Sequence, residues 1–163
     1  MQNGAKHAAI AVAFGAAILL SACQAEQKAG IAEIHEGDRL TTFSQEITSS
    51  IRQFQVKASG SYTLDINVKN TGTQPWFGGG KAMSVEAGYR WLDNKGNVLP
   101  IEGNRAPLDR PVVRPGETDA LKLEVVAPAS PGAYSLRVSM VQEGVAWFAD
   151  QGAAPLVLQV TVE

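Results

Sequence analysis

One residue stands in surroundings that point to a specific reaction: Cys23, the only cysteine in the chain. A deprotonated thiol is a strong nucleophile and can accept a covalently attached group. Positive charge at Lys6 is followed by an apolar run over residues 8–20, and the small residues Ser21 and Ala22 then lead to the cysteine. This order is the anatomy of a secretory signal peptide, and the run is shorter than the ~20 residues that a membrane-spanning helix needs.

Leu20-Ser21-Ala22-Cys23 resembles the lipobox of bacterial lipoproteins, in which Leu stands three positions before Cys and small residues lie between. The resemblance implies that a signal peptidase recognises Leu20, Ser21 and Ala22 and cleaves before Cys23. It also implies diacylglycerol on the sulfur and an acyl group such as palmitate on the new amino terminus. Two or three acyl chains anchor a protein stably, at ~0.8 kcal/mol per buried CH₂. The alternatives are a secreted protein whose signal ends in Cys and a cytosolic protein with a buried apolar helix.

The sequence therefore predicts a signal peptide over residues 1–22, a tether over 23–42 and one domain over 43–163. In enterobacterial lipoproteins an Asp after the acylated Cys signals retention in the inner membrane. Gln24 occupies that position here. By resemblance, we expect a lipid anchor in the bacterial cell envelope, on the periplasmic side, with the outer membrane favoured over the inner membrane.

Composition argues against nucleic acid as a partner and against disulfides as a source of stability. The formal net charge is −2 at pH 7, so there is no strong positive field for nucleic acid. Hydrophobic residues make up 45% of the chain, enough to build a core. With Cys23 acylated, no cysteine remains for a disulfide, so packing alone must stabilise the domain.

Alternation of apolar and polar residues predicts an all-β domain. Residues 62–69 give the clearest case, since Leu64, Ile66 and Val68 share one face while Asp65 and Asn67 share the other. Strands are predicted near 52–57, 62–69, 83–91, 98–101, 121–125, 134–140 and 156–162, with short segments at 105–109 and 145–148 and a loop over 73–80. Turns at 93–96, 114–117 and 128–132 separate them. Roughly seven to nine short strands indicate an Ig-like or fibronectin-III-like antiparallel β-sandwich.

Several short motifs follow one another along the chain: Asn70-x-Gly72-x-x-x-Trp76, Pro115-Gly116-Glu117, Ala127-Pro128, Pro131-Gly132-x-Tyr134 and Trp147-Phe148. This order is similar to that of Ig-like modules that occur in bacterial surface proteins, beside polysaccharide-synthesis enzymes, and in the four-tryptophan domains of autophagy receptors. The resemblance covers about two-thirds of the chain and implies the sandwich fold. It departs from the four-tryptophan pattern at Tyr62. Tyr134 is expected to act as a tyrosine corner, with its hydroxyl bonded to nearby backbone.

Residues for catalysis are scarce after residue 22. His35 is the only histidine there and lies in the predicted tether, which leaves too few His and Cys ligands for a metal site. The carboxylates Glu102, Asp109, Glu117 and Asp119 fall in loops or near strand ends, where solvated side chains are the simpler interpretation. The 93–97 segment lacks the spacing and terminal Glu of a calcium loop and is interpreted as a hairpin. We expect no enzyme activity, no metal and no cofactor.

Aromatic residues are the candidates for recognition. Trp76 and Phe77 lie in a Gly-rich loop, and Trp147 and Phe148 lie near another glycine. Exposed aromatic rings bind sugars and anchor protein interfaces, whereas rings at the ends of a sandwich can equally plug its core.

The arginines Arg90, Arg105 and Arg110 can rim such a site. The leading hypothesis is a non-catalytic, lipid-anchored envelope protein whose Ig-like domain binds a protein or a cell-surface polysaccharide. The alternative is a structural or accessory subunit of an envelope assembly.

Overall fold

The computed structural model describes residues 34–80, 82–101 and 103–163. The predicted signal peptide, Cys23 and most of the predicted tether lie outside these residues. Within the described ranges, no helix is both long enough and apolar enough to span a membrane.

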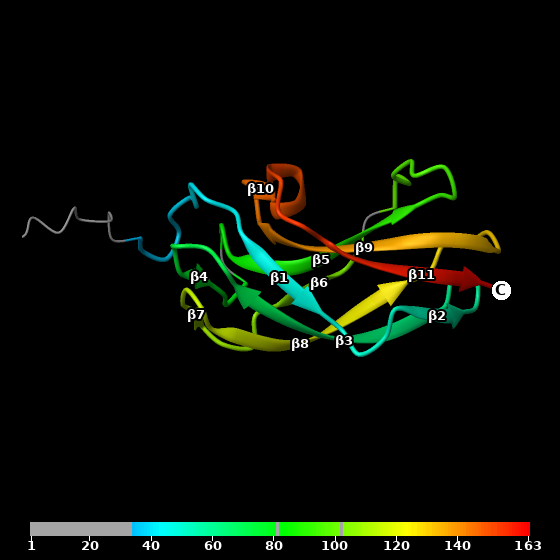
Figure 1. Ribbon diagram of the computed structural model, residues 1–163, viewed down its shortest axis with the longest axis horizontal. Helices are drawn as coiled ribbons and strands as arrows, with labels where there is room; N and C mark the ends of the chain where they lie inside the picture. Colours follow the sequence, from blue (N-terminus) through cyan, green and yellow to red (C-terminus); the bar gives the residue numbers. More distant parts are fainter. Residues whose placement is uncertain (1–33, 81, 102) are drawn as a thin grey trace, which may run out of the picture. The chain divides into compact units, whose positions relative to one another are not determined.

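The predicted all-β sandwich is confirmed, and Figure 1 shows its two main sheets as layers. Sheet A has the order β1 (Gln45–Thr48), β3 (Ser61–Asn70) and β8 (Thr118–Val126). Sheet B has the order β2 (Gln53–Val56), β11 (Leu156–Val162), β9 (Gly132–Gln142), β5 (Val85–Leu92) and β6 (Arg105–Pro107), with β10 (Ala146–Trp147) also paired to β9. A small third sheet joins β4 (Trp76–Phe77) to β7 (Val112–Val113), and one 3-10 turn, η1, covers Phe148–Gln151. The pairings are antiparallel except for the parallel pair β2–β11.

Alternating side chains build the core between the sheets. In β3, Leu64, Ile66 and Val68 are buried while the residues between them are exposed. β11 repeats this pattern from Leu156 to Val162. In β5, by contrast, Gly88 and Leu92 on the outward positions are buried too. The outer face of sheet B is therefore covered where β5 runs, unlike the outer face of sheet A.

Two aromatic side chains tie the sheets together through hydrogen bonds. Tyr89 and Trp91 project from β5 into the core, where both are almost fully buried. The Tyr89 hydroxyl accepts a 2.9 Å bond from the Val126 N–H, and Trp91 Nε1 donates a 2.9 Å bond to the Val126 carbonyl. Both backbone groups of Val126 are thus satisfied by side chains of the opposite sheet.

Three strand predictions need correction. The segment 43–57 contains two strands, because β1 precedes the predicted strand that became β2. The alternating pattern of β1 is weak in the sequence because one of its two buried positions is polar. Gln45 accepts a 2.8 Å bond from Met140 N–H and donates one of 2.9 Å to the Ala154 carbonyl. The expected strand at 98–101 is only a single bridge between Leu92 and Val98, and the expected loop at 73–80 contains β4.

The expected boundary between tether and domain at residue 43 is also wrong. Leu40 is only 5% exposed and belongs to the core. Its N–H donates to Gln142 Oε1 at 2.9 Å, while Gln74 Oε1 accepts bonds from the N–H groups of Thr41 and Thr42. Two buried glutamines on distant segments thus dock residues 40–42 onto the sandwich.

The motif residues have structural roles. Asn70 is fully buried at the end of β3, where its amide donates to the carbonyls of Gln74 and Val113 at 2.8 and 3.0 Å and its Oδ1 accepts from Gly72 N–H at 3.0 Å. The predicted tyrosine corner is confirmed, since the Tyr134 hydroxyl donates to the Ser130 carbonyl at 3.0 Å.

Candidate ligand-binding face

The outer face of sheet B carries a partly exposed tryptophan in a built setting. Trp147, from β10, extends over β5 to the position of Gly88. A Cβ on Gly88 would lie 2.8 Å from Trp147 Cη2, closer than carbon atoms normally approach. Glycine is therefore required at this outward position of the strand, because a side chain there would occupy the place of the indole.

Two arginines hold the indole from neighbouring strands. The guanidinium carbons of Arg90 and Arg105 lie over the Trp147 ring, 4.2 and 4.6 Å from its centroid, which is the range of cation–π attraction. Asp150 in η1 accepts two bonds from Arg90, at 2.7 and 3.0 Å. Glu143 accepts a 2.6 Å bond from Arg105 Nε. We call these five residues the Trp147 network.

A groove of about 700 Å³ opens beside the network. Its lining combines four of the five network residues with other residues of β5 and with the segment after the β5 hairpin: Glu86, Tyr89, Arg90, Val98, Leu99, Pro100, Ile101, Gly103, Arg105, Glu143 and Trp147. Glu86 already accepts a bond from the Ser84 hydroxyl at 2.9 Å, and Glu143 is held by Arg105. The groove therefore presents held polar groups and an aromatic edge, an arrangement suited to binding.

A second hollow of about 490 Å³ lies on the same face, over β2, β11 and β9. Its outward polar side chains are neutral: Gln53, Gln55, Gln159 and Thr161. The register of the strands places outward residues side by side in rows that cross sheet B. From the second hollow to the Trp147 groove, the rows are Gln55, Thr161 and Ala133; Gln53, Gln159 and Ser135; Val157, Arg137 and Arg90; and Ser139, Gly88 and Arg105. Arg137 thus stands between the amide-rich hollow and the Trp147 groove.

The structure separates the four predicted recognition residues. The expectation of an exposed surface is wrong for Trp76 and Phe148, which are 1% and 0% exposed and pack edge to face at 5.5 Å. These two rings plug the end of the sandwich, the alternative interpretation of the pattern. Phe77 is partly exposed on the small β4–β7 sheet, and only Trp147 belongs to the face described above.

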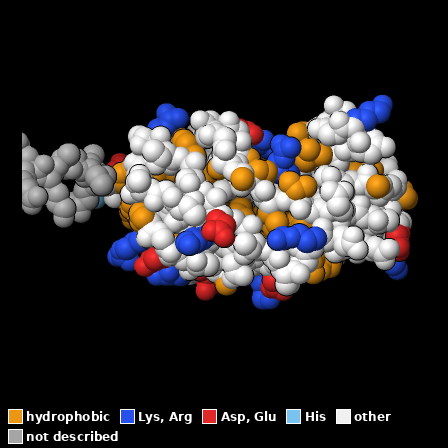
Figure 2. Space-filling model, viewed as in Figure 1, with side chains coloured by type: hydrophobic (Ala, Val, Ile, Leu, Met, Phe, Trp, Pro, Cys, Tyr) orange, Lys and Arg blue, Asp and Glu red, His pale blue; other side chains and the backbone are white. Residues whose placement is uncertain are grey.

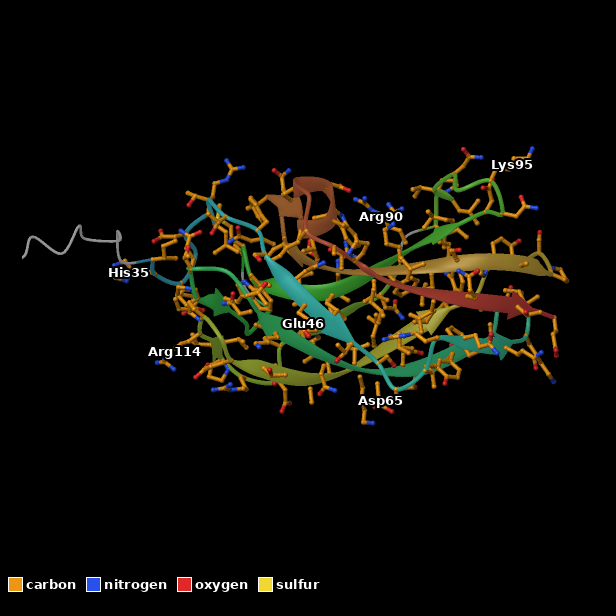
Figure 3. All side chains as sticks on the ribbon, viewed as in Figure 1. His35, Glu46, Asp65, Arg90, Lys95 and Arg114 are labelled. Carbon is orange, nitrogen blue, oxygen red and sulfur yellow. The ribbon has the colours of Figure 1, made fainter. Side chains whose placement is uncertain are left out.

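The sequence analysis placed arginines beside a recognition site, but it did not predict which residues they contact. Arg90 and Arg105 do rim the groove, whereas Arg110 pairs with Glu117 at 3.1 Å near the start of β8. Alternation places Arg90 outward on β5, as Figure 3 shows. Nothing in the sequence indicates that Trp147 crosses to Gly88, because that contact joins segments far apart in the chain.

Other predicted chemistry lies away from this face. His35 is exposed near the start of the described chain. Asp93 caps its hairpin turn by accepting bonds from the N–H groups of Lys95 and Asn97, both at 2.8 Å. In the described part of the chain, no three His, Cys, Asp or Glu residues cluster as metal ligands.

No protein-family model matches the sequence, and no curated protein matches it. A β-glucosidase from Listeria innocua in complex with glucose is 14% identical, with TM-score 0.45 over 73% of this chain and 16% of that chain. The CARDB domain of the PF1109 protein from Pyrococcus furiosus is 16% identical, with TM-score 0.39 over 80% and 99% of the two chains. A PapD-like domain of human CEP192 is 11% identical, with TM-score 0.32 over 80% and 91%. The chain thus spans only 16% of the length of the β-glucosidase.

Proposed function

We propose that this chain is a non-catalytic, lipid-anchored protein of the bacterial envelope that binds a partner through the outer face of sheet B. The lipobox resemblance at residues 20–23 supports the anchor. The Trp147 network supports the face, because it holds a partly exposed indole and two arginines in fixed positions beside a groove of about 700 Å³. Pre-positioned side chains lose little conformational entropy when a ligand binds.

The side chains of the described groove lining are consistent with a binding role. Among the described lining residues there is no histidine or cysteine. The carboxylates of Glu86 and Glu143 are hydrogen-bonded to Ser84 and Arg105.

The anchor is tested by expressing the full chain and Cys23→Ala in a bacterial host. We expect a wild-type mass that matches cleavage before Cys23 plus lipid, and membrane association that the variant loses. An unlipidated wild-type protein in the soluble fraction would contradict the anchor.

The binding face is tested by photo-cross-linking in living cells. A photoreactive residue at Val98, beside the Trp147 groove, is compared with one at Thr63, on the outer face of sheet A. We expect a specific cross-linked species from position 98 alone. Cross-links from position 63 with none from 98 would place the interface elsewhere, and a fixed stoichiometric protein complex would favour the accessory-subunit alternative.

A further inference from the structure

An unpaired arginine lies at the centre of the proposed binding face. Arg137 points outward from β9, where it is partly buried. Its Nε is buried and has no hydrogen-bond partner among the described residues. Each of its arginine neighbours in the Trp147 network has a carboxylate partner, Asp150 for Arg90 and Glu143 for Arg105. Arg137 is thus the arginine of this face whose charge the described structure leaves uncompensated.

The position makes this charge costly. Register places Arg137 directly opposite Arg90 on the neighbouring strand. Asp150 offsets part of the Arg90 charge, but like charges at opposite cross-strand positions still repel, and a buried donor without a partner costs further free energy. An arginine that destabilises its own fold in this way is typical of a functional site, where stability is given up for binding.

We infer that Arg137 binds a carboxylate of an acidic polysaccharide that lies along the outer face of sheet B. This inference rests on the proposed function and names the chemical class of its ligand. A guanidinium can donate two parallel hydrogen bonds to a carboxylate, and no carboxylate of the described structure occupies the terminal nitrogens of Arg137.

The residues on either side of Arg137 favour a sugar chain over a peptide. Gln159, Ser135 and Gln53 form the adjacent row, and amides and hydroxyls both donate and accept hydrogen bonds, as sugar hydroxyls do. Val98 and Val157 are the only exposed large hydrophobic residues in the described chain, and both lie on this face, one in the groove and one opposite Arg137. Two valines are a small apolar core for a protein interface, which needs large apolar anchors. Figure 2 views the sandwich with its two sheets one above the other, and on that side the apolar side chains are scattered rather than gathered in one patch.

The dimensions suit an elongated ligand. Successive outward positions along a strand lie about 7 Å apart, so the rows from Gln55 to Arg105 extend over about 20 Å. The amide-rich hollow lies at one end of this track, the Trp147 groove lies at the other, and Arg137 stands between them. A polysaccharide of several sugar units with at least one carboxylate fits this arrangement.

The test uses a matched pair of sugars. Oligogalacturonate carries a carboxylate on every ring, and its fully methyl-esterified form is the same chain without charge. Full-length protein in lipid nanodiscs is titrated with each, as wild type, Arg137→Gln, Arg137→Lys and Arg114→Gln. Arg114 is an exposed arginine of the turn before β8, which belongs to the other sheet from Arg137, and it serves as the control.

We expect wild type to bind the acid, and Arg137→Gln to weaken that binding roughly tenfold or more, as the loss of a charge-assisted hydrogen bond does. Arg137→Lys should retain part of the affinity and Arg114→Gln all of it. The methyl ester should bind more weakly and be insensitive to Arg137→Gln. The melting temperature of Arg137→Gln should equal or exceed that of wild type, because the substitution removes an unsatisfied donor and a like-charge pair.

Three results would overturn the inference: wild type that binds neither sugar, equal binding of acid and ester, or full retention of acid binding by Arg137→Gln. A photo-cross-linker at Val157, opposite Arg137, separates this failure from that of the proposed function. A protein partner captured there without sugar binding overturns the acidic polysaccharide and leaves the binding face standing. Equal binding of acid and ester does the same, since a neutral sugar is then the ligand.

Discussion

The outer faces of the two sheets are both produced by alternating apolar and polar residues, but one is solvated and the other is partly covered by the chain. On sheet A, register sets Asp65 opposite Lys122 and Glu46 opposite Lys69. The Asp65 and Lys122 side chains are 72% and 75% exposed, so their 2.7 Å contact lies in water. Figure 3 shows Asp65 pointing away from β3 into solvent. This face is an ordinary solvated surface.

On sheet B, the chain returns to cover its own outer face. β10 and η1 bring Trp147 and Asp150 onto β5, and the arginine side chains there are only 27% and 30% exposed. Charges that sheet A leaves in water are here partly desolvated and stacked on an aromatic ring. The segment that packs over a strand, more than the strand's own pattern, therefore decides whether an outward residue becomes part of a site.

The largest loss of stability that we expect comes from Asn70, the buried polar residue at the end of β3 in sheet A. Asn70→Asp removes both donors that hold the Gln74 and Val113 carbonyls and sets a carboxyl group against them. The expected loss is about 3 kcal/mol or more of unfolding free energy, because buried unsatisfied groups cost ~1–3 kcal/mol each. Chemical denaturation measures it. Asn67→Asp, the same change on the exposed side of β3, is the control and should stay within about 0.5 kcal/mol.

The next effect tests whether sheet B requires an empty position under the indole. Gly88→Ala places a methyl group 2.8 Å from Trp147 Cη2 and near the Arg105 side chain. We expect a loss of about 1–3 kcal/mol, as for other overpacking changes. Trp76 and Trp91 are buried, so a red shift of tryptophan fluorescence will report displacement of Trp147.

Removing the indole provides the control for Gly88→Ala. In a Trp147→Ala background, Gly88→Ala should cost less, since the closest contact is gone and only the Arg105 side chain, at 3.1 and 3.2 Å, remains near the added methyl group. An equal loss of stability with and without the indole would show that the strand, and not Trp147, demands glycine.

How far the sequence could predict these features depends on the range of the contacts involved. The sandwich followed from alternation in β3 and β11, which is a local signal. The Tyr134 corner was predictable from its motif. Gln45 and Leu40 were not placed correctly, because their burial depends on Met140 and Gln142, about a hundred residues away. Trp147 and Phe148 are adjacent, and only the path of β10 into η1 decides which ring is buried.

Double-mutant cycles measure the contrast between the faces directly. For Arg105 and Glu143 we expect a coupling of about 1 kcal/mol, since the pair is half-buried and Arg105 also stacks on Trp147. For Asp65 and Lys122 we expect roughly 0–0.5 kcal/mol, because exposed pairs are screened by water and salt. Equal couplings would remove the distinction between the two faces, and 1 M NaCl should abolish the sheet A coupling first.

The smallest effects should appear on acidification, in one turn of each sheet. The Arg114 N–H bonds the carboxylate of Glu117, before β8, and lowers its pKa below the ordinary 4.5. The side-chain amide of Asn97 does the same for Asp93, after β5, and lowers its pKa below the ordinary 3.8. Each carboxylate therefore stabilises the fold above its unfolded pKa.

Because each folded pKa is depressed, each contribution fades as pH falls below the ordinary value and is lost once pH drops through the folded pKa. Glu117→Gln should therefore flatten the decline of stability with pH from about 4.5 downward, and Asp93→Asn should do so from about 3.8 downward. Both changes should be small, since both groups are exposed. Urea unfolding at a series of pH values will show them, and a decline that neither substitution changes would assign acid sensitivity to other carboxylates.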